Sequence, residues 1–580
     1  MSATAGKFAS SGLTAAGGFG TLQKQWLLYM GLPWAVGGMQ AMVYVFVATQ
    51  PVLMISVCTL ETARLGCRPH PIDECPTDPS LYEFAGDIYK SVVSEFGLAC
   101  ENSSWAVALQ SELFFGFLVG VWAIGWMGDR FGRKPALWLS VVTTQLFGLL
   151  SFVAPTYLAY AISRLGVGLG IGGLGLSSYV LATEVTAPEW RSLVCVVTSS
   201  IFALGIVAVS SLAAIPNIHW RMLSFGVWML SWACVLPALL LTLFLESPVW
   251  LEARGRHAEA EAGLRKIAIV NNRQAEFDSF LKKWDDQHIP APDGDFSIED
   301  GDKKDSLPAS TKEDDSLWGL LVTKRLNIIQ EFVAVMVAAW FASSLGYYGL
   351  SMNVGNLGGS IYLNSILNAL VEIPSYGMMY FMVDNAITGR KLTLTIYLLA
   401  GGIACVIGPL FTWLHWLSLT IALLGKFFVS AAFGVCYIYG SELFPTSIRS
   451  SALGIQSLAA RIAGIISPLV PPLGEVWSPL PNLIFGIPCI VAAVFILRLL
   501  PETLGRSLPM TVEDVRALRQ YSVGSAEPPR PGHGQTGKYE MPLDEFDTDS
   551  SNDSEAEEDE RRARTLRDVF GTEFGPKASE

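Results

Sequence analysis

Charge is scarce in this sequence of 580 residues. Only 16% of the residues are charged and 51% are hydrophobic, whereas soluble domains usually contain roughly 25% charged residues. Two stretches, 25–60 and 193–220, contain no Lys, Arg, Asp or Glu. Apolar runs of about 18 residues or more are typical of membrane spans. The scarcity of charge therefore argues against an ordinary soluble protein and predicts an integral membrane protein.

Residues for common catalytic chemistries are also sparse. The six histidines are scattered, and the sequence contains no metal-ligand spacing, no phosphate-binding P-loop and no nucleophile elbow. We therefore expect no enzyme activity, no metal, no cofactor and no ATP-driven pumping.

The apolar segments form two groups of six. Their length and their Leu, Ala, Gly and Val content predict helices, because barrel strands would be about ten residues long and would alternate in polarity. We place the spans at 26–50, 105–127, 136–155, 157–182, 193–214, 222–245, 327–350, 361–383, 392–413, 417–440, 452–472 and 481–500. The predicted fold class is an all-α integral membrane protein with two six-helix bundles.

Hydrophilic segments set the domain boundaries. We predict an N-terminal segment, a first bundle with a cysteine-containing loop, a central loop, a second bundle and a tail, at 1–25, 26–250 (loop 51–104), 251–326, 327–505 and 506–580. Ten acidic residues and no Lys or Arg lie between positions 544 and 560, so the tail carries most of the net charge of −13. Its composition predicts disorder. Ser550, Ser551 and Ser554 suit an acidophilic kinase, although a merely solvated tail explains them equally well.

Four of the nine cysteines gather in the hydrophilic loop, at Cys58, Cys67, Cys75 and Cys100. An even number of cysteines in such a loop predicts disulfides if the loop faces outside the cell. Free thiols are the alternative, and the spacing does not select among the pairings.

Basic residues in the loops predict the orientation. Arg130, Arg133 and Lys134 follow the second span, further Lys and Arg residues lie in the central loop, and Arg390 and Lys391 follow the eighth span. All these loops fall on one side of the membrane, which the positive-inside rule assigns to the cytoplasm. Both termini would then be cytoplasmic and the cysteine loop would be extracellular.

The two halves of the sequence repeat each other. Gly132-Arg-Lys recurs as Gly389-Arg-Lys, the Glu184-x6-Arg191 pattern recurs from Glu442 to Arg449, and Glu246 matches Glu502, all at nearly the same offset. This repetition predicts a duplicated six-helix unit, an architecture in which two halves rock around a site near the middle of the membrane.

The segment Gly125–Lys134, "GWMGDRFGRK", contains the complete pattern G-x-x-x-D-R-x-G-R-K, and "ESPVWL" follows at 246–251. At these residues the chain resembles the major facilitator superfamily. We expect the cations of this loop to pair with acids at helix ends and so to latch the cytoplasmic side, although a purely topogenic basic loop is the alternative. The residues assigned to this cytoplasmic gate are Gly125, Asp129, Arg130, Gly132, Arg133, Lys134, Glu184, Arg191, Glu246, Glu442, Arg449 and Glu502.

Within that superfamily the chain is more similar to the organic ion transporter family, which includes organic cation, organic anion and carnitine transporters. The segments 347–376 and 425–454 resemble its carnitine-type branch. The resemblance implies a secondary transporter of small organic ions in the plasma membrane, with a carnitine- or betaine-like zwitterion or an organic anion favoured. Organic cation transport, sugar transport and a receptor or scaffold without transport are the alternatives, and the coupling ion, sodium or proton, stays open.

Ionisable residues inside membrane spans are costly and are therefore candidates for function. Of these, Arg461 is the most informative, because the resemblance implies Asp at this position in cation transporters and Arg in anion and carnitine transporters. A guanidinium group can bind a carboxylate through two parallel hydrogen bonds. The alternative is a structural Arg paired with an acid, which is the role we expect for Arg164. For Glu112, an ion site and a structural pair both stay open.

Aromatic residues share helix faces with the other charges. Lys426 lies on one face with Phe433 and Tyr437, and Glu372 lies on one face with Tyr376. An aromatic cage beside Glu372 would hold a quaternary ammonium group by cation–π attraction, while Lys426 could instead reach the outer interface. The predicted substrate-binding residues are Arg461, Glu372, Tyr376, Trp340, Tyr347, Tyr348, Phe433, Tyr437 and Lys426.

Overall fold

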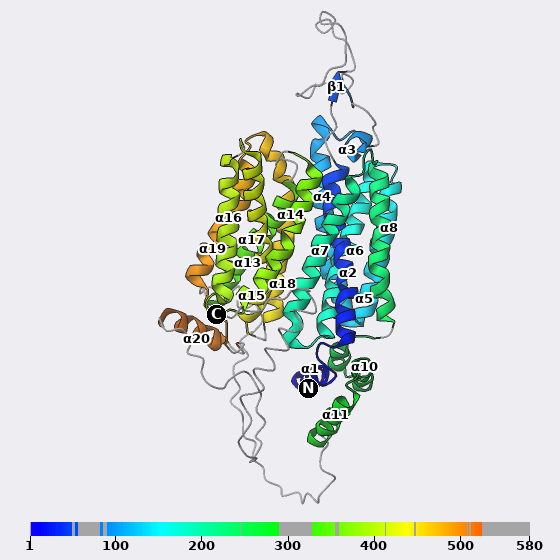
Figure 1. Cartoon of the computed structure of the whole chain (residues 1–580), viewed down its shortest axis with the longest axis vertical. Helices are drawn as coiled ribbons and strands as arrows, with labels where there is room; N and C mark the ends of the chain where they lie inside the picture. Colours follow the sequence, from blue (N-terminus) through cyan, green and yellow to red (C-terminus); the bar gives the residue numbers. More distant parts are fainter. Residues whose placement is uncertain are drawn as a thin grey trace, which may run out of the picture. The chain divides into compact units, whose positions relative to one another are not determined.

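The computed structural model describes residues 2–48, 53–55, 82–84, 90–243, 245–288, 328–353, 359–411, 413–445, 448–506, 509 and 512–524. Twelve helices in this part of the chain are long and apolar enough to cross a membrane, which confirms the predicted number of spans (Figure 1). No predicted span boundary differs from the observed one by more than five residues. The acidic tail and most of the central loop lie outside the described residues.

The first bundle consists of α2 (Thr21–Val47), α4 (Ser103–Phe131), α5 (Arg133–Val153), α6 (Tyr157–Glu184), α7 (Arg191–Ala213) and α8 (Trp220–Thr242). Helices α4 and α6 approach each other closely through small residues. A Cβ atom on Gly168 would lie 2.1 Å from the carbonyl oxygen of Leu113, and one on Gly116 would lie 2.1 Å from that of Leu165. Small residues at such positions let helix backbones pack in a bilayer, where helix association depends on van der Waals contact.

The second bundle consists of α13 (Ile328–Met352), α14 (Ile361–Leu370), α15 (Glu372–Val383), α16 (Gly389–Ile407), α17 (His415–Glu442), α18 (Arg449–Ile466) and α19 (Leu480–Leu499). The eighth span is divided into α14 and α15 at Val371. Pro374 explains this break, because proline has no N–H to donate to the carbonyl of Leu370 four residues earlier. The span predicted at 361–383 is thus one membrane crossing made of two helices.

Shorter elements lie outside the spans. The helices α1 (Ser2–Ala15), α9 (Pro248–Ala253), α10 (His257–Val270) and α11 (Gln274–His288) gather near the start of α2 (Figure 1). The side chain of Asn271 fastens them, since it donates to Ala16 O and Gln23 Oε1 and accepts from Leu22 N. Helix α1 was not predicted.

The remaining elements are small. The loop before α4 contains α3 (Val92–Glu95) and a pair of antiparallel strands, β1 (Leu53–Ile55) and β2 (Tyr82–Phe84), which pair Leu53 with Phe84. Helix α20 (Val512–Gly524) follows the last span, and its Arg519 pairs with Glu331 at 2.6 Å. The chain divides into a unit of residues 1–523 and a second unit that begins at 524.

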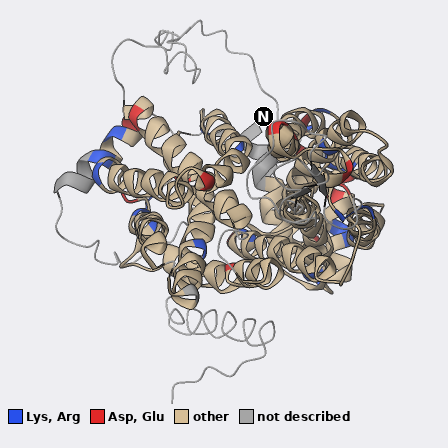
Figure 2. Cartoon of the chain, turned by 90° about the horizontal axis from the view of Figure 1, so that it is seen from above, with Lys and Arg blue, Asp and Glu red and all other residues tan. Residues whose placement is uncertain are grey.

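Successive spans alternate in direction, so their loops fall at two ends. We call the end that carries the turn between α4 and α5 the motif end, and the end that carries Cys100 the cysteine end. Figure 2 shows that Lys, Arg, Asp and Glu occupy few positions along the helices. The few charges that do lie inside the bundles therefore need individual explanations.

The bundles contact each other near the cysteine end. Ser111 Oγ of α4 donates to Ile465 O of α18 at 2.8 Å, and the hydroxyl groups of Ser210 in α7 and Ser365 in α14 are 2.8 Å apart. Phe46, at the end of α2, stacks on Tyr362 with ring centroids 5.8 Å apart. These contacts close the cysteine end between the bundles.

The close packing of α4 on α6 gives a stability prediction. Gly168→Ala places a methyl group against backbone atoms that side-chain rotation cannot move, so we expect the apparent melting temperature of the purified protein to fall by about 5 °C or more. Gly377→Ala is the matched control, because a Cβ atom there meets nothing within 4 Å. Equal melting temperatures for the two variants in a fluorescence thermal-shift assay would contradict this account of α4–α6 packing.

Candidate functional site

A cavity of about 210 Å³ lies between the two bundles. Helices α2, α4, α6 and α7 form one side, and α13, α15, α17 and α18 form the other. Its aromatic lining consists of Trp34, Phe117, Tyr179, Phe202, Tyr348, Tyr376, Phe433 and Tyr437. Among the described residues that line it, Arg461 is the only one with a charged side chain. The cavity is thus an aromatic chamber with a single positive charge.

Arg461 reaches this cavity from α18. Its guanidinium carbon lies 4.3 Å from the centroid of the Phe117 ring, which belongs to α4 of the other bundle. The hydroxyl groups of Tyr348 and Tyr437 are near enough to interact with its charge. Within the described part of the chain, no carboxylate forms an ion pair with Arg461 and its Nε atom has no hydrogen-bond partner. The structural alternative, an Arg paired with an acid, therefore has no support among these residues.

Five of the nine predicted substrate-binding residues line the cavity: Arg461, Tyr348, Tyr376, Phe433 and Tyr437. Trp340 lies behind the wall, with its ring centroid 4.3 Å from that of Tyr437 and 5.5 Å from that of Phe433. Trp340 therefore supports the cavity wall from behind and is not among the residues that line it.

Glu372 and Lys426 form a fully buried ion pair. Lys426 Nζ lies 3.0 Å from Glu372 Oε1, and both side chains have an exposed fraction of 0%. The same ammonium group donates to Tyr347 O at 3.1 Å and to Ser351 Oγ at 2.6 Å, and it lies 3.2 Å from the centroid of the Tyr347 ring. Lys426 is therefore held inside the second bundle, and the alternative that it extends to the outer interface is wrong.

The carboxylate of Glu372 has two further partners. The hydroxyl groups of Tyr347 and Tyr376 donate to Oε2 at 2.9 Å and 3.0 Å. Of these residues only Tyr376 lines the cavity. A direct contact between Glu372 and a substrate cation stays a prediction. The structure connects Glu372 to the cavity indirectly, because its carboxylate accepts a hydrogen bond from Tyr376, which lines the cavity.

At the motif end of the first bundle, the predicted gate residues form one cluster. Arg133 Nη2 lies 2.9 Å from Glu184 Oε1, and Arg133 Nη1 lies 2.6 Å from Asp129 Oδ1. Glu246 accepts a hydrogen bond from the backbone N–H of Lys134 at 3.1 Å. The intervening Gly132 has φ +115° and leaves room for the Glu246 carboxylate, which a Cβ atom would approach to 3.0 Å.

The second bundle repeats this cluster. Arg390 pairs with Glu442 at 3.2 Å and with Asp384 at 3.1 Å, and Glu502 accepts from the backbone N–H groups of Arg390 and Lys391 at 2.9 Å and 3.0 Å. Both clusters join helices of one bundle only. The pairing of loop cations with helix-end acids is as expected, and the predicted role of these pairs as a latch of the cytoplasmic side in the outward-open state stays a prediction.

Four other predicted gate residues lie outside these two ion-pair clusters. Arg130 lies over the Trp126 ring at 5.5 Å, and Arg449 Nε donates to Phe444 O at 3.3 Å. Arg191 begins α7, and Gly125 of α4 packs near Leu176. The gating roles of all these residues stay predictions.

Two ionisable residues of the first bundle, Arg164 and Glu112, lie outside the cavity lining. Arg164 is buried and donates to Gln40 Oε1 at 3.1 Å and to Gln40 O at 3.0 Å, contacts that suit a structural role. Glu112 lies in α4 outside the cavity lining. Cys100 is disulfide-bonded, while Cys58, Cys67 and Cys75 lie outside the described residues.

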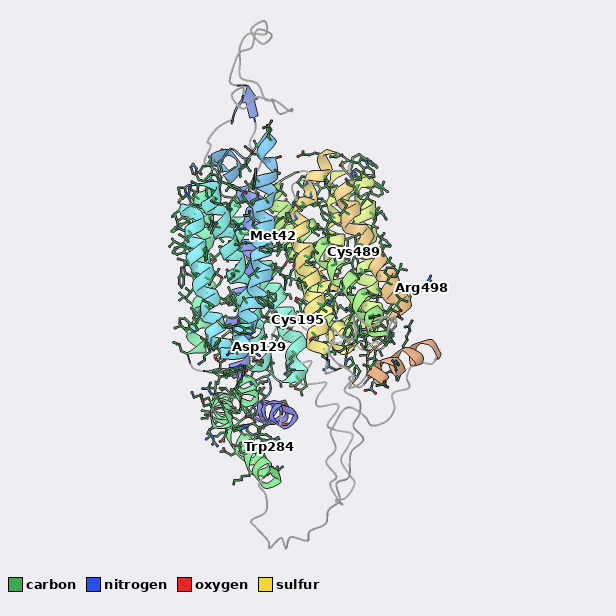
Figure 3. The ribbon with its side chains drawn as sticks, turned by 180° about the vertical axis from the view of Figure 1, so that it is seen from behind. Met42, Asp129, Cys195, Trp284, Cys489 and Arg498 are labelled. Atoms are coloured by element: carbon green, nitrogen blue, oxygen red, sulfur yellow. The ribbon has the colours of Figure 1, made fainter. Side chains whose placement is uncertain are left out.

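The contribution of the first bundle to the cavity was not predicted. Trp34, Phe117, Tyr179 and Phe202 line it. So does Cys195, which Figure 3 labels between the bundles. In the sequence, the first four of these residues are recognisable only as aromatic residues inside spans. Many aromatic residues in spans merely pack against neighbouring helices, so this feature does not identify a cavity lining.

In the described part of the chain, twelve spans in two related bundles enclose a cavity, an arrangement typical of membrane transporters. The chain matches the family described as sugar (and other) transporter over residues 79–513. It is 32% identical to an "Organic cation transporter protein" of Drosophila melanogaster over 77% of this chain and 78% of the relative. It is 30% identical to human "Solute carrier family 22 member 13" over 80% and 79%, and 31% identical to "Organic cation/carnitine transporter 4" of Arabidopsis thaliana over 85% and 88%.

Solved structures agree on the fold. The partially occluded inward-open xylose transporter XylE from E. coli aligns with a TM-score of 0.56 at 18% identity, covering 84% of this chain and 100% of that one. The inward-open form of the same transporter aligns with a TM-score of 0.54. The chain thus belongs to the sugar (and other) transporter family of the major facilitator superfamily and, within it, to the organic ion transporters of solute carrier family 22. It is a multi-pass membrane transporter and not an enzyme.

The buried pair gives a second prediction. Lys426→Met leaves the buried carboxylate of Glu372 without its ammonium partner, which is typically costly, whereas neutralising both partners is often tolerated. We expect Lys426→Met to lower the melting temperature by about 5 °C or more and the added Glu372→Gln to restore at least half of the loss.

The comparison requires both single variants and the double variant, purified in the same detergent. If the losses from Lys426→Met and Glu372→Gln simply add in the double variant, the two side chains are not energetically coupled and this account of the pair is wrong.

Proposed function

We propose that this transporter carries small organic ions that bear a carboxylate, with carnitine- or betaine-like zwitterions first and organic anions second. One observation carries the proposal: Arg461 is the only charged side chain among the described residues that line the cavity. A positive charge in surroundings of low dielectric constant attracts an anionic group strongly and repels a cation that has no anionic group of its own. The planar guanidinium group also matches the two oxygens of a carboxylate.

Aromatic walls suit the other end of such a zwitterion. Quaternary ammonium groups bind the faces of Trp, Tyr and Phe rings. Trp34, Tyr179 and Phe202 of the first bundle face Tyr376 and Phe433 of the second across the cavity. We therefore assign the ammonium end to these rings and leave Glu372 the supporting role of fixing Tyr376.

The names of the relatives fit the same chemistry. They include organic cation transporters and an organic cation/carnitine transporter. A carnitine-like zwitterion has a cationic end and a carboxylate end, so it satisfies both the aromatic lining and Arg461.

Transport would follow alternating access. We assign the motif end to the cytoplasm, because its loops carry the basic residues, and the cysteine end to the outside of the plasma membrane. The contacts between the bundles near the cysteine end then describe an inward-facing state. The Arg133 and Arg390 clusters would keep the motif end of each bundle rigid while the bundles rock.

Uptake into cells that express the protein tests the substrate class. Labelled carnitine, benzoate and tetraethylammonium are supplied with and without sodium, which also identifies sodium coupling. We expect carnitine uptake to exceed tetraethylammonium uptake, and Arg461→Ala to lower carnitine uptake at least about tenfold at equal surface level, because hydrogen bonds to charged groups are worth that much.

Arg461→Lys is the matched control, since it keeps the charge but loses the planar pair of donors, and we expect intermediate uptake. Tetraethylammonium uptake that Arg461→Ala leaves unchanged, without carnitine or benzoate uptake, would overturn the carboxylate assignment. No uptake of any probe at normal surface level would favour a receptor on this fold.

A further inference from the structure

The contact between Arg461 and Phe117 crosses from one bundle to the other. The guanidinium carbon lies over the ring at 4.3 Å from its centroid, a distance typical of cation–π contacts. Both residues line the cavity and both are half-buried. The single charge of the cavity is therefore held by an aromatic ring that the opposite bundle supplies.

The contact with Phe117 leaves N–H donors of Arg461 available, although the hydroxyl group of Tyr437 takes one of them. A guanidinium group has five N–H donors, and a phenylalanine ring has no oxygen or nitrogen atom to accept them. In the described part of the chain, Nε has no hydrogen-bond partner although it is buried. A buried donor without a partner is costly, and this one belongs to a side chain that lines the cavity, where a ligand can accept its hydrogen bond.

The contact belongs to the seam between α4 and α18. On the cysteine-end side of Phe117, Ser111 Oγ donates to Ile465 O, and a Cβ atom on Gly464 would lie 3.1 Å from the Phe114 ring. Opening the cysteine end has to part α4 from α18. The ring of Phe117 then leaves the guanidinium group of Arg461.

We propose that Phe117 is a positioning residue that orients Arg461 for carboxylate binding when the α4–α18 seam is closed. This inference rests on the proposed function. With the seam closed, the ring holds the guanidinium group in place beside the cavity, which lowers the ordering cost of binding. With the seam open, Arg461 loses that support. Carboxylate binding and closure of the cysteine end therefore favour each other, which is what a substrate-driven closing step requires.

Direct binding measurements on the purified full-length protein test the proposal. The probes are carnitine and choline, which shares the trimethylammonium group but has no carboxylate. Phe117→Leu keeps an apolar side chain and removes the ring. We expect it to raise the Kd of carnitine about threefold to tenfold, as cation–π contacts of this strength imply, and to leave the Kd of choline unchanged. Phe117→Tyr should bind carnitine like the wild type.

Phe433→Leu is the matched control, because it removes a cavity ring that lies on the same bundle as Arg461 and contacts Trp340 and Tyr437 instead. Its effect should be equal for carnitine and choline. An equal effect of Phe117→Leu on both probes would overturn the proposal and make Phe117 an ordinary wall residue.

A second measurement needs no ligand. Phe117→Leu should lower the melting temperature of the empty protein more in the wild-type background than in the Arg461→Ala background, because the contact exists only in the former. Equal losses in the two backgrounds would also overturn the proposal. A wild-type protein that binds neither carnitine nor benzoate would instead overturn the proposed function, which separates the two failures.

Discussion

The cost of charge inside a membrane governs this structure. A charged side chain within a span has to find a partner in the protein or in a water-filled cavity. Arg164 meets the oxygens of Gln40, and Lys426 meets Glu372. Arg461 differs from both, because its side chain lines the cavity, between the ring of Phe117 and the hydroxyl group of Tyr437. A charge that faces the cavity marks the candidate site more sharply than the fold does.

The same cost explains why the two bundles repeat one cluster at the motif end. Loop cations and helix-end acids neutralise each other where the spans leave the membrane, and each cluster also uses backbone N–H groups. Gly132 and Gly389 adopt positive φ values of +115° and +56°, so both turns bring a carboxylate close to the backbone. Each cluster closes its own bundle, and this leaves the motif ends of the bundles free to separate from each other. A latch made of pairs across the bundles would have the opposite effect in this state.

Much of the fold follows from the sequence, because hydropathy and the internal repeat are local signals. The spans, the two bundles and the matched gate residues are of this kind. Pro374 could also have predicted the division between α14 and α15. The ion pair of Glu372 and Lys426 is different, since these residues lie on separate helices and no spacing within one helix joins them. Phe117 is one of 30 phenylalanines, and only the packing of α4 against α18 distinguishes it from the others.

The interrupted eighth span connects these observations. Glu372 is the first residue of α15, at the break, and its carboxylate is held by Lys426 of α17 and by Tyr347 of α13. Three helices of the second bundle thus meet at one buried point next to an irregular stretch of backbone. Tyr376 donates to the same carboxylate and faces the cavity, one helical turn after the break. Under the proposed function, a substrate in the cavity contacts Tyr376 in the first turns of α15, directly after the break. The ion pair of Glu372 and Lys426 restricts how α15 can move, because a displacement of Tyr376 away from Glu372 breaks a hydrogen bond to a fully buried carboxylate.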